Sequence, residues 1–189
     1  MVVLTAAGCR DDGRTLADAP APLPTTAPPA VEDVSSTEPV GPFTLASPAV
    51  DAEARLDPSV TCDGDGRAPT LTVSGAPPGA AELAIAVVDD TALGYVHWVV
   101  TGIPASTALI DGALLARPGV TAATTTGGVV GWEGPCPPDA DPHAYTFTIY
   151  ALAEPLGIDS GGDGAELLGS LGISAFAQSS FTAFYTRAP

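Results

Sequence analysis

From residue 43 onward, the chain consists of short apolar segments separated by turns rich in glycine and proline. Short runs that alternate, or that are continuously apolar with many β-branched and aromatic residues, are typical of β-strands. Five runs fit this pattern, over residues 71–74, 82–88, 95–101, 144–152 and 181–186. Their number and spacing favour a mostly β fold with antiparallel strands.

One late segment has apolar residues at helical spacing. It covers residues 163–171, and Asp163 or Ser160 is expected to cap its first turn. We expect Gly172 to end this helix and residues 173–178 to form a further turn before the last strand.

The first 42 residues have a different composition. Residues 1–9 place a short apolar run and small residues before Cys9, which resembles the end of a bacterial lipoprotein signal peptide. The basic start of such a peptide is missing, so we expect a truncated signal segment with Cys9 as the lipidation site. An ordinary cytosolic N-terminus is the alternative. Residues 10–42 are acidic and rich in Pro, Ala and Thr. We expect them to be a linker to a domain over 43–189, or a tail without an anchoring role.

The charge of the chain is strongly negative. There are 22 acidic residues against 6 arginines and no lysine, which gives a formal net charge of −16. Such a surface repels phosphate backbones, so nonspecific nucleic-acid binding is excluded as a function. Adsorption to anionic lipid is excluded on the same ground, and membrane contact is expected only through a lipid on Cys9.

Four ordered groups of residues carry a family resemblance. They are Phe43–Pro48 with Thr61–Gly66 and Ser74–Pro77, Ala86–Asp90 with Val96–Val100 and Ile103–Pro104, Gly131–Pro138, and His143–Leu152. In this order and spacing they resemble the phosphatidylethanolamine-binding protein (PEBP) family, in its bacterial Raf-kinase-inhibitor-like branch. The resemblance implies a large central antiparallel sheet, a smaller second sheet and a short C-terminal helix.

The resemblance also implies a small pocket for an anion: phosphate, a phospholipid headgroup or a carboxylate. Carried over by position, its residues are Asp90, His97, Gly134, Pro135, His143 and Tyr145. An imidazole donates to an anion from one ring nitrogen while a carboxylate, here Asp90, fixes the other. Tyr145 adds a hydroxyl, and the Gly134–Pro135 turn leaves backbone N–H groups for an oxyanion. The alternative is that both histidines are buried structural residues. No cofactor or metal is expected.

Two departures from the family pattern weaken the expected pocket. Residues 91–94 read Thr-Ala-Leu-Gly where the family usually has Pro-Asp-x-Pro, and Ala144 stands where an arginine is usual. With few cations near the site and an acidic chain around it, anion affinity should rise with salt and with falling pH.

Cys62 and Cys136 remain if Cys9 carries a lipid, and export to an oxidising compartment would join them in a disulfide. Two reduced, buried thiols are the alternative. A zinc site with the two histidines is disfavoured, because no pair has the close spacing of known zinc motifs.

These features lead us to expect a noncatalytic binding protein, lipid-anchored outside the cell, for a small anion or phospholipid headgroup. The first alternative is an inhibitor of a peptidase or another protein partner, since an acidic surface suits a basic partner. The second is a hydrolase using Asp90 and the two histidines, although no activated nucleophile accompanies them.

Overall fold

The structure, a computed structural model, describes residues 41–187. The signal segment, Cys9 and nearly all of the linker lie outside these residues, so the expectations about them stay predictions. Among the helices in the described range, none is long and apolar enough to span a bilayer.

The larger sheet has five antiparallel strands in the order β6-β4-β3-β7-β8. Their bounds are Glu82–Asp89 (β3), Tyr95–Pro104 (β4), Thr121–Ala122 (β6), His143–Leu152 (β7) and Ala175–Tyr185 (β8). The central strand β3 is apolar and buried along almost its whole length. Sandwiched between other elements on both faces, it needs no polar side, which explains its continuous apolar run.

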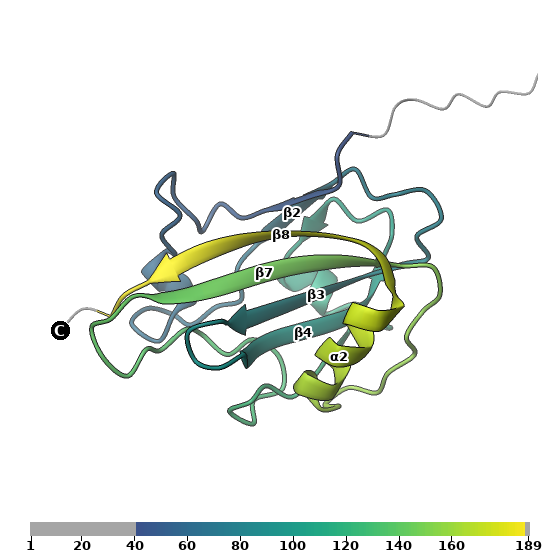
Figure 1. The fold of residues 1–189 in the computed structure, drawn as a ribbon. Coiled ribbons are helices and arrows are strands. Elements are labelled where there is room, and N and C mark those ends of the chain that lie inside the picture. Colours follow the sequence, from purple (N-terminus) through teal and green to yellow (C-terminus); the bar gives the residue numbers. More distant parts are fainter. Residues whose placement is uncertain (1–40, 188–189) are drawn as a thin grey trace, which may run out of the picture. The chain divides into compact units, whose positions relative to one another are not determined.

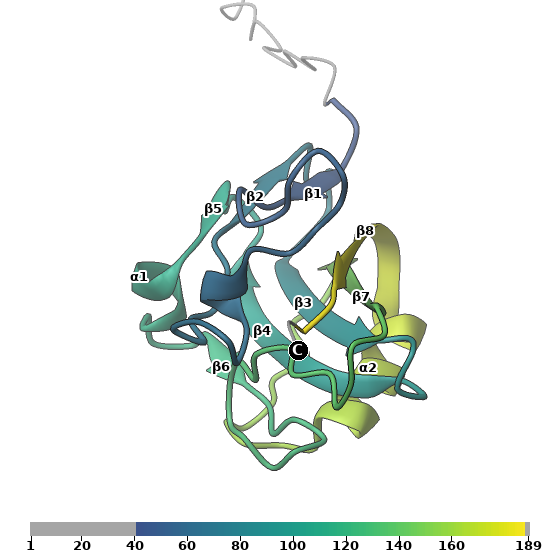
Figure 2. The same ribbon diagram turned by 90° about the vertical axis from the view of Figure 1, so that its left-hand side faces the viewer.

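The smaller sheet has three antiparallel strands in the order β1-β2-β5, with bounds Thr44–Ala46, Leu71–Ser74 and Leu109–Ile110. Its apolar side chains, such as Leu45 and Val73, share one core cluster with Ile85 and Val87 of β3. The opposite face of the larger sheet carries Ala84 and other small residues, which pack against the helix α2. Figures 1 and 2 show these three layers. The predicted mostly β, two-sheet fold is confirmed.

Three short helices complete the described chain: Pro58–Val60 (η1), Gly112–Leu115 (α1) and Gly164–Ser174 (α2). The predicted cap is confirmed, because the Asp163 carboxylate accepts the backbone N–H groups of Ala165 and Glu166 at 2.8 and 3.0 Å. The predicted end at Gly172 is wrong. A glycine costs an exposed helix only about 1 kcal/mol, and α2 continues to Ser174. At Ala175 the backbone becomes extended and pairs with Leu152 of β7, so part of the turn expected over residues 173–178 is strand.

Candidate functional site

A cavity of about 200 Å³ lies where the end of β3 meets the beginnings of β4 and β7. Because β3 runs antiparallel to both neighbours, its last residue, Asp89, pairs with Tyr95 on one side and with Tyr145 on the other. The lining residues are Asp89, Ala92, Tyr95, His97, Glu133, Gly134, Cys136, Pro137, Pro138, His143 and Tyr145. Both histidines of the chain therefore face one cavity, as expected.

The floor of the cavity holds a buried carboxylate–imidazole pair. His143 Nδ1 donates to Asp89 Oδ2 at 2.7 Å, and the two residues are 8% and 3% exposed. The other oxygen, Asp89 Oδ1, accepts the backbone N–H groups of Thr91 and Ala92 at 2.9 and 3.0 Å. Three donors thus satisfy the Asp89 carboxylate, and its bond to Nδ1 fixes the orientation of the His143 ring.

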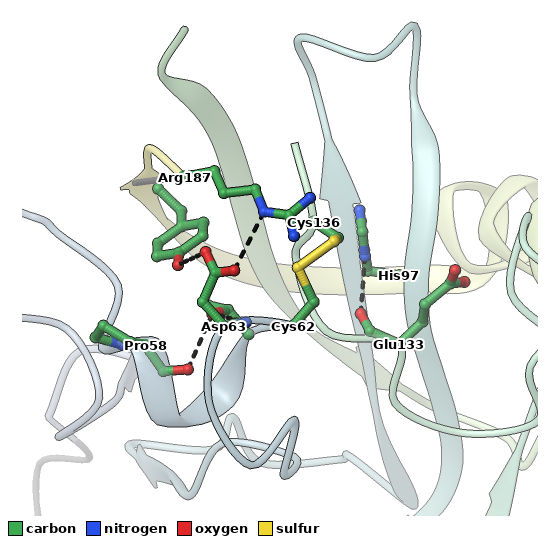
Figure 3. The surroundings of a disulfide bond; sticks show 9 residues. Pro58, Cys62, Asp63, His97, Glu133, Cys136 and Arg187 are labelled. Atoms are coloured by element: carbon green, nitrogen blue, oxygen red, sulfur yellow. Dashed lines mark hydrogen bonds and ion pairs between the residues drawn. A yellow bond between two sulfur atoms is a disulfide. The ribbon is translucent and has the colours of Figure 1, made fainter. Parts of the chain in front are cut away.

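His97 is fixed by a different partner. Its Nδ1 lies 2.8 Å from the backbone carbonyl oxygen of Glu133. A carbonyl only accepts, so Nδ1 carries the proton and Nε2 is left for a ligand; Figure 3 shows Nε2 on the far side of the ring from this bond. Burial is the main cause that lowers the pKa of His97, which keeps the ring neutral at neutral pH.

Tyr145 contributes the third polar group. Its side chain is fully buried, and its hydroxyl makes no hydrogen bond to any of the described residues. Burial first, and then the negative charge and the hydrogen-bonding capacity of the nearby Asp89 carboxylate, raise the pKa of Tyr145 far above that of a free tyrosine. The group therefore stays an O–H donor, and its ring contacts the His97 ring edge-on at 5.3 Å between centroids.

Asp90 does not take the role predicted for it. It is exposed, lies outside the cavity lining, and accepts a 2.6 Å hydrogen bond from the Thr146 hydroxyl. Side chains alternate along β3, so Asp89 continues the face of Ile85 and Val87 while the next residue turns away. Asp89 is thus the residue that orients His143, and the alternation of large and small apolar side chains along β3 was the signal that distinguishes the two acids.

The other two predicted positions lie on the segment after β6. Gly134 lines the cavity, and a Cβ there would come within 3.1–3.2 Å of the backbone of Val60 and Thr61, which explains the glycine. Pro135 is buried outside the lining, and its carbonyl accepts the backbone N–H of Cys62 at 3.1 Å.

Glu133 and Tyr95 were not predicted. The Tyr95 hydroxyl donates to Glu133 Oε1 at 2.9 Å, and the Thr125 hydroxyl donates to Glu133 Oε2. Burial and this carboxylate raise the pKa of Tyr95 to about 12. A Cβ on Gly127 would collide with the Glu133 carboxylate, so the loop at Gly127 closes over this network. No periodicity links these positions in the sequence.

The predicted disulfide is present. Cys62 and Cys136 are bonded with their Cα atoms 5.4 Å apart, and Cys136 lines the cavity (Figure 3). The pairing removes both thiols from the zinc alternative. Within residues 41–187, no group of three or more His, Cys, Asp or Glu side chains is placed to hold a metal ion.

A second contact beside the disulfide ties the same two segments together. Trp132 Nε1 donates to the carbonyl of Val60 at 3.1 Å. On the other side, Asp63 accepts the Tyr185 hydroxyl at 2.6 Å and Arg187 Nε at 3.1 Å. These contacts connect the rim of the cavity to η1 and to the end of β8.

Two antiparallel sheets with one small, histidine-lined cavity at the ends of the central strands define a class of small β proteins built around a polar pocket. Residues 46–186 match the family model described as phosphatidylethanolamine-binding protein, and the chain belongs to this family.

Relatives and solved structures agree with this assignment. The chain is 36% identical over 181 residues to a Mycobacterium tuberculosis protein with the name "Putative lipoprotein LppC", and the match covers 94% of this chain and 88% of the relative. It is 32% identical over 133 residues to Escherichia coli YbhB, covering 66% and 84% of the two chains. The crystal structure of Escherichia coli YbcL, described as a member of the mammalian PEBP family, superposes with a TM-score of 0.70 at 29% identity, covering 77% and 99%. CT736 of Chlamydia trachomatis gives 0.68 at 25% identity, covering 77% and 98%.

Proposed function

We propose that this protein is a noncatalytic binding protein whose cavity holds a small oxyanion, such as phosphate, the phosphoryl part of a lipid headgroup, or a carboxylate. One observation carries the proposal: Nδ1 of both His97 and His143 is already bonded, to Glu133 O and Asp89 respectively. Nε2 of each ring and the unpartnered Tyr145 hydroxyl are therefore the polar atoms left for a ligand.

The same contacts favour binding over catalysis. A general base needs a free lone pair close to a nucleophile. Asp89 is held by three donors, and Cys136 is consumed by the disulfide, so neither serves as a nucleophile. In the described lining there is no serine, threonine or lysine to take that role.

The test uses the small number of histidines. The chain has two, so each imidazole gives a separate NMR signal that is assigned with one variant. Inorganic phosphate and phosphoethanolamine are titrated into the full chain, by calorimetry and by imidazole NMR. We expect both histidine signals to shift with the same saturation curve, and His143→Ala to abolish binding.

Asp90→Asn is the matched control, because Asp90 neighbours Asp89 in sequence but lies outside the cavity. It should bind like the unchanged protein. A folded protein that shows neither heat nor a histidine shift at millimolar ligand contradicts the proposal.

We further propose that the domain is anchored by lipid at Cys9 on the outer side of a membrane. Two observations support this: a relative named as a lipoprotein aligns over 94% of the chain, and disulfides such as Cys62–Cys136 persist in oxidising compartments. Mass spectrometry of the native N-terminus should find an acylated Cys9, and Cys9→Ser should release the protein from the membrane fraction. An unmodified native N-terminus contradicts the anchor.

A further inference from the structure

We propose that the cavity selects an oxyanion that still carries an acidic proton, namely the monoanion of phosphate or of a phosphate monoester, over sulfate and over phosphodiesters. The inference rests on the proposed function and narrows its ligand class. It follows from the donors, acceptors and charges that the cavity presents.

The hydrogen-bonding groups come first. His97 offers a lone pair on Nε2, because Nδ1 holds the proton against the Glu133 carbonyl and the buried ring is neutral. Tyr145 offers the complementary O–H donor. A ligand that satisfies both must donate one hydrogen bond and accept another. The P–OH and P–O groups of a phosphate monoanion do this, whereas sulfate above about pH 3 and a phosphodiester have only acceptors.

The titratable and charged groups around His97 leave this pattern of hydrogen-bond donors and acceptors unchanged. They are Asp89 of β3, Tyr95 of β4, Glu133 on the loop, and His143 and Tyr145 of β7. Asp89 is committed to His143 and to two backbone N–H groups, and Glu133 to the hydroxyls of Tyr95 and Thr125. The two carboxylates are therefore already satisfied, and the proton shared with His97 Nε2 has to come from the ligand.

The charges around the cavity also favour a ligand with a single negative charge. No lysine or arginine is among the lining residues, and the Asp89 carboxylate lies on the cavity floor. Each additional negative charge on the ligand is repelled in this poorly solvated site. A dianion is thus disfavoured by its charge, and sulfate and the dianion of a phosphate monoester are disfavoured also because they carry no proton. This is why a protein so acidic, with net charge −16, still offers a site for one class of anion.

The size of the ligand does not explain a preference for phosphate over sulfate. The cavity of about 200 Å³ is smaller than the roughly 300–1,000 Å³ typical of sites for drug-sized ligands, so it suits a small ligand with one tetrahedral group. Sulfate and phosphate have nearly the same size and shape. Any preference between them must come from the proton.

The experiment measures the binding of four ligands to the full chain without substitutions, at constant ionic strength. They are inorganic phosphate, phosphoethanolamine (a monoester), glycerophosphoethanolamine (a diester) and sulfate, at about pH 5.5 and about pH 7.5. The second pKa of a phosphate monoester is about 6, and that of inorganic phosphate is higher, so the monoanion of both ligands predominates at the lower pH. We expect phosphate and phosphoethanolamine to bind at least roughly tenfold more tightly than sulfate and the diester at the lower pH, and to weaken at the higher.

Two further readouts test the assigned atoms. In the phosphate complex, the ¹⁵N shift of His97 Nε2 should remain that of an unprotonated acceptor. His97→Gln places an amide donor near the position of Nε2, so its preference for phosphate over sulfate should fall to about twofold or less, while its fold is checked by circular dichroism.

The outcomes separate the two proposals. If sulfate or the diester binds the unchanged protein as tightly as phosphate, the selection for a protonated ligand is overturned and oxyanion binding stands. If His97 Nε2 is protonated in the complex, the selection is likewise overturned. If none of the four ligands binds to the folded protein, the proposed function itself fails.

Discussion

The two walls of the cavity are built in different ways. The strand wall consists of Asp89, His97, His143 and Tyr145 on β3, β4 and β7. The loop wall consists of residues 133–138, which have no regular secondary structure. Strand pairing positions the first wall: Asp89 is opposite Tyr145 in the register, although 56 residues separate them in sequence. Discrete contacts position the second, above all the Cys62–Cys136 disulfide and the bond from Trp132 to Val60.

This difference shows where the site tolerates the loss of a single contact and where it does not. The backbone hydrogen bonds of three strands hold the backbone positions of the imidazoles and the carboxylate, so removing one side chain leaves these strands in place. The loop wall depends on a few bonds to the segment around η1, and each of them can be removed separately. The predictions below act on one wall at a time.

The largest effect is expected from the disulfide. Its cysteines are separated by 74 residues, and closing a loop of this length stabilises the folded state by about 4 kcal/mol in the chain-entropy model. The double variant Cys62→Ala, Cys136→Ala should lose stability of this order in urea unfolding. Hydrogen exchange should accelerate in residues 133–138, while amides of β3 and β7 stay protected under native conditions. Equal acceleration in both walls contradicts the comparison.

The next effect concerns the strand wall. Asp89→Asn removes the charge from a buried group that accepts three hydrogen bonds, and bonds to charged groups contribute about 1.5–3 kcal/mol. We expect a loss of about 2 kcal/mol in the free energy of unfolding and a shift of the His143 ring signals. Asp90→Asn, at the exposed neighbour, should change stability by less than about 0.5 kcal/mol. Similar losses in both variants would show that Asp89 has no special role.

A smaller effect is expected at Gly127 in the loop that covers Glu133. A Cβ there collides with the Glu133 carboxylate and the Tyr95 hydroxyl, and overpacking costs about 1–3 kcal/mol. Gly127→Ala should therefore destabilise the protein by about 1–2 kcal/mol. Gly172→Ala is the matched control, because nothing lies near its Cβ position within α2; it should stabilise the helix by up to about 1 kcal/mol. The two thermal shifts should have opposite signs.

The smallest effect is a pH dependence from His97. Burial lowers its pKa in the folded state, so the unfolded chain takes up the proton first as the pH falls. The associated stability is complete above the unfolded pKa of about 6.5 and is lost as the pH falls through that value to the folded pKa. His97→Asn keeps a donor for the Glu133 carbonyl but does not titrate. Its stability should therefore fall less than that of the unchanged protein between about pH 7 and pH 5, and identical slopes would contradict the assignment.

Sequence reasoning predicted the strand wall far better than the loop wall. Alternation and β-branched residues located β2, β3, β4 and β7, and a cap residue located the start of α2. Along β3 the alternation of large and small apolar side chains distinguishes Asp89 from Asp90. The cluster of Glu133, Tyr95 and Thr125 had no such signal, because side-chain contacts between a strand and irregular loops leave no periodicity in the chain. The disulfide was predictable only from the count of cysteines and an expected compartment.

The position of β7 between β3 and β8 also has a consequence for the order in which the strands pair during folding. The central strand pairs with β4 across a short turn, but its other edge waits for residues 143–152, more than fifty positions later in the chain. Pairing over such separations is slow, because loop-closure entropy is lost before the contacts form. The His143–Asp89 bond bridges this junction. We therefore expect the His143 imidazole to report the step in which β7 joins β3, and the cavity to form at that same step.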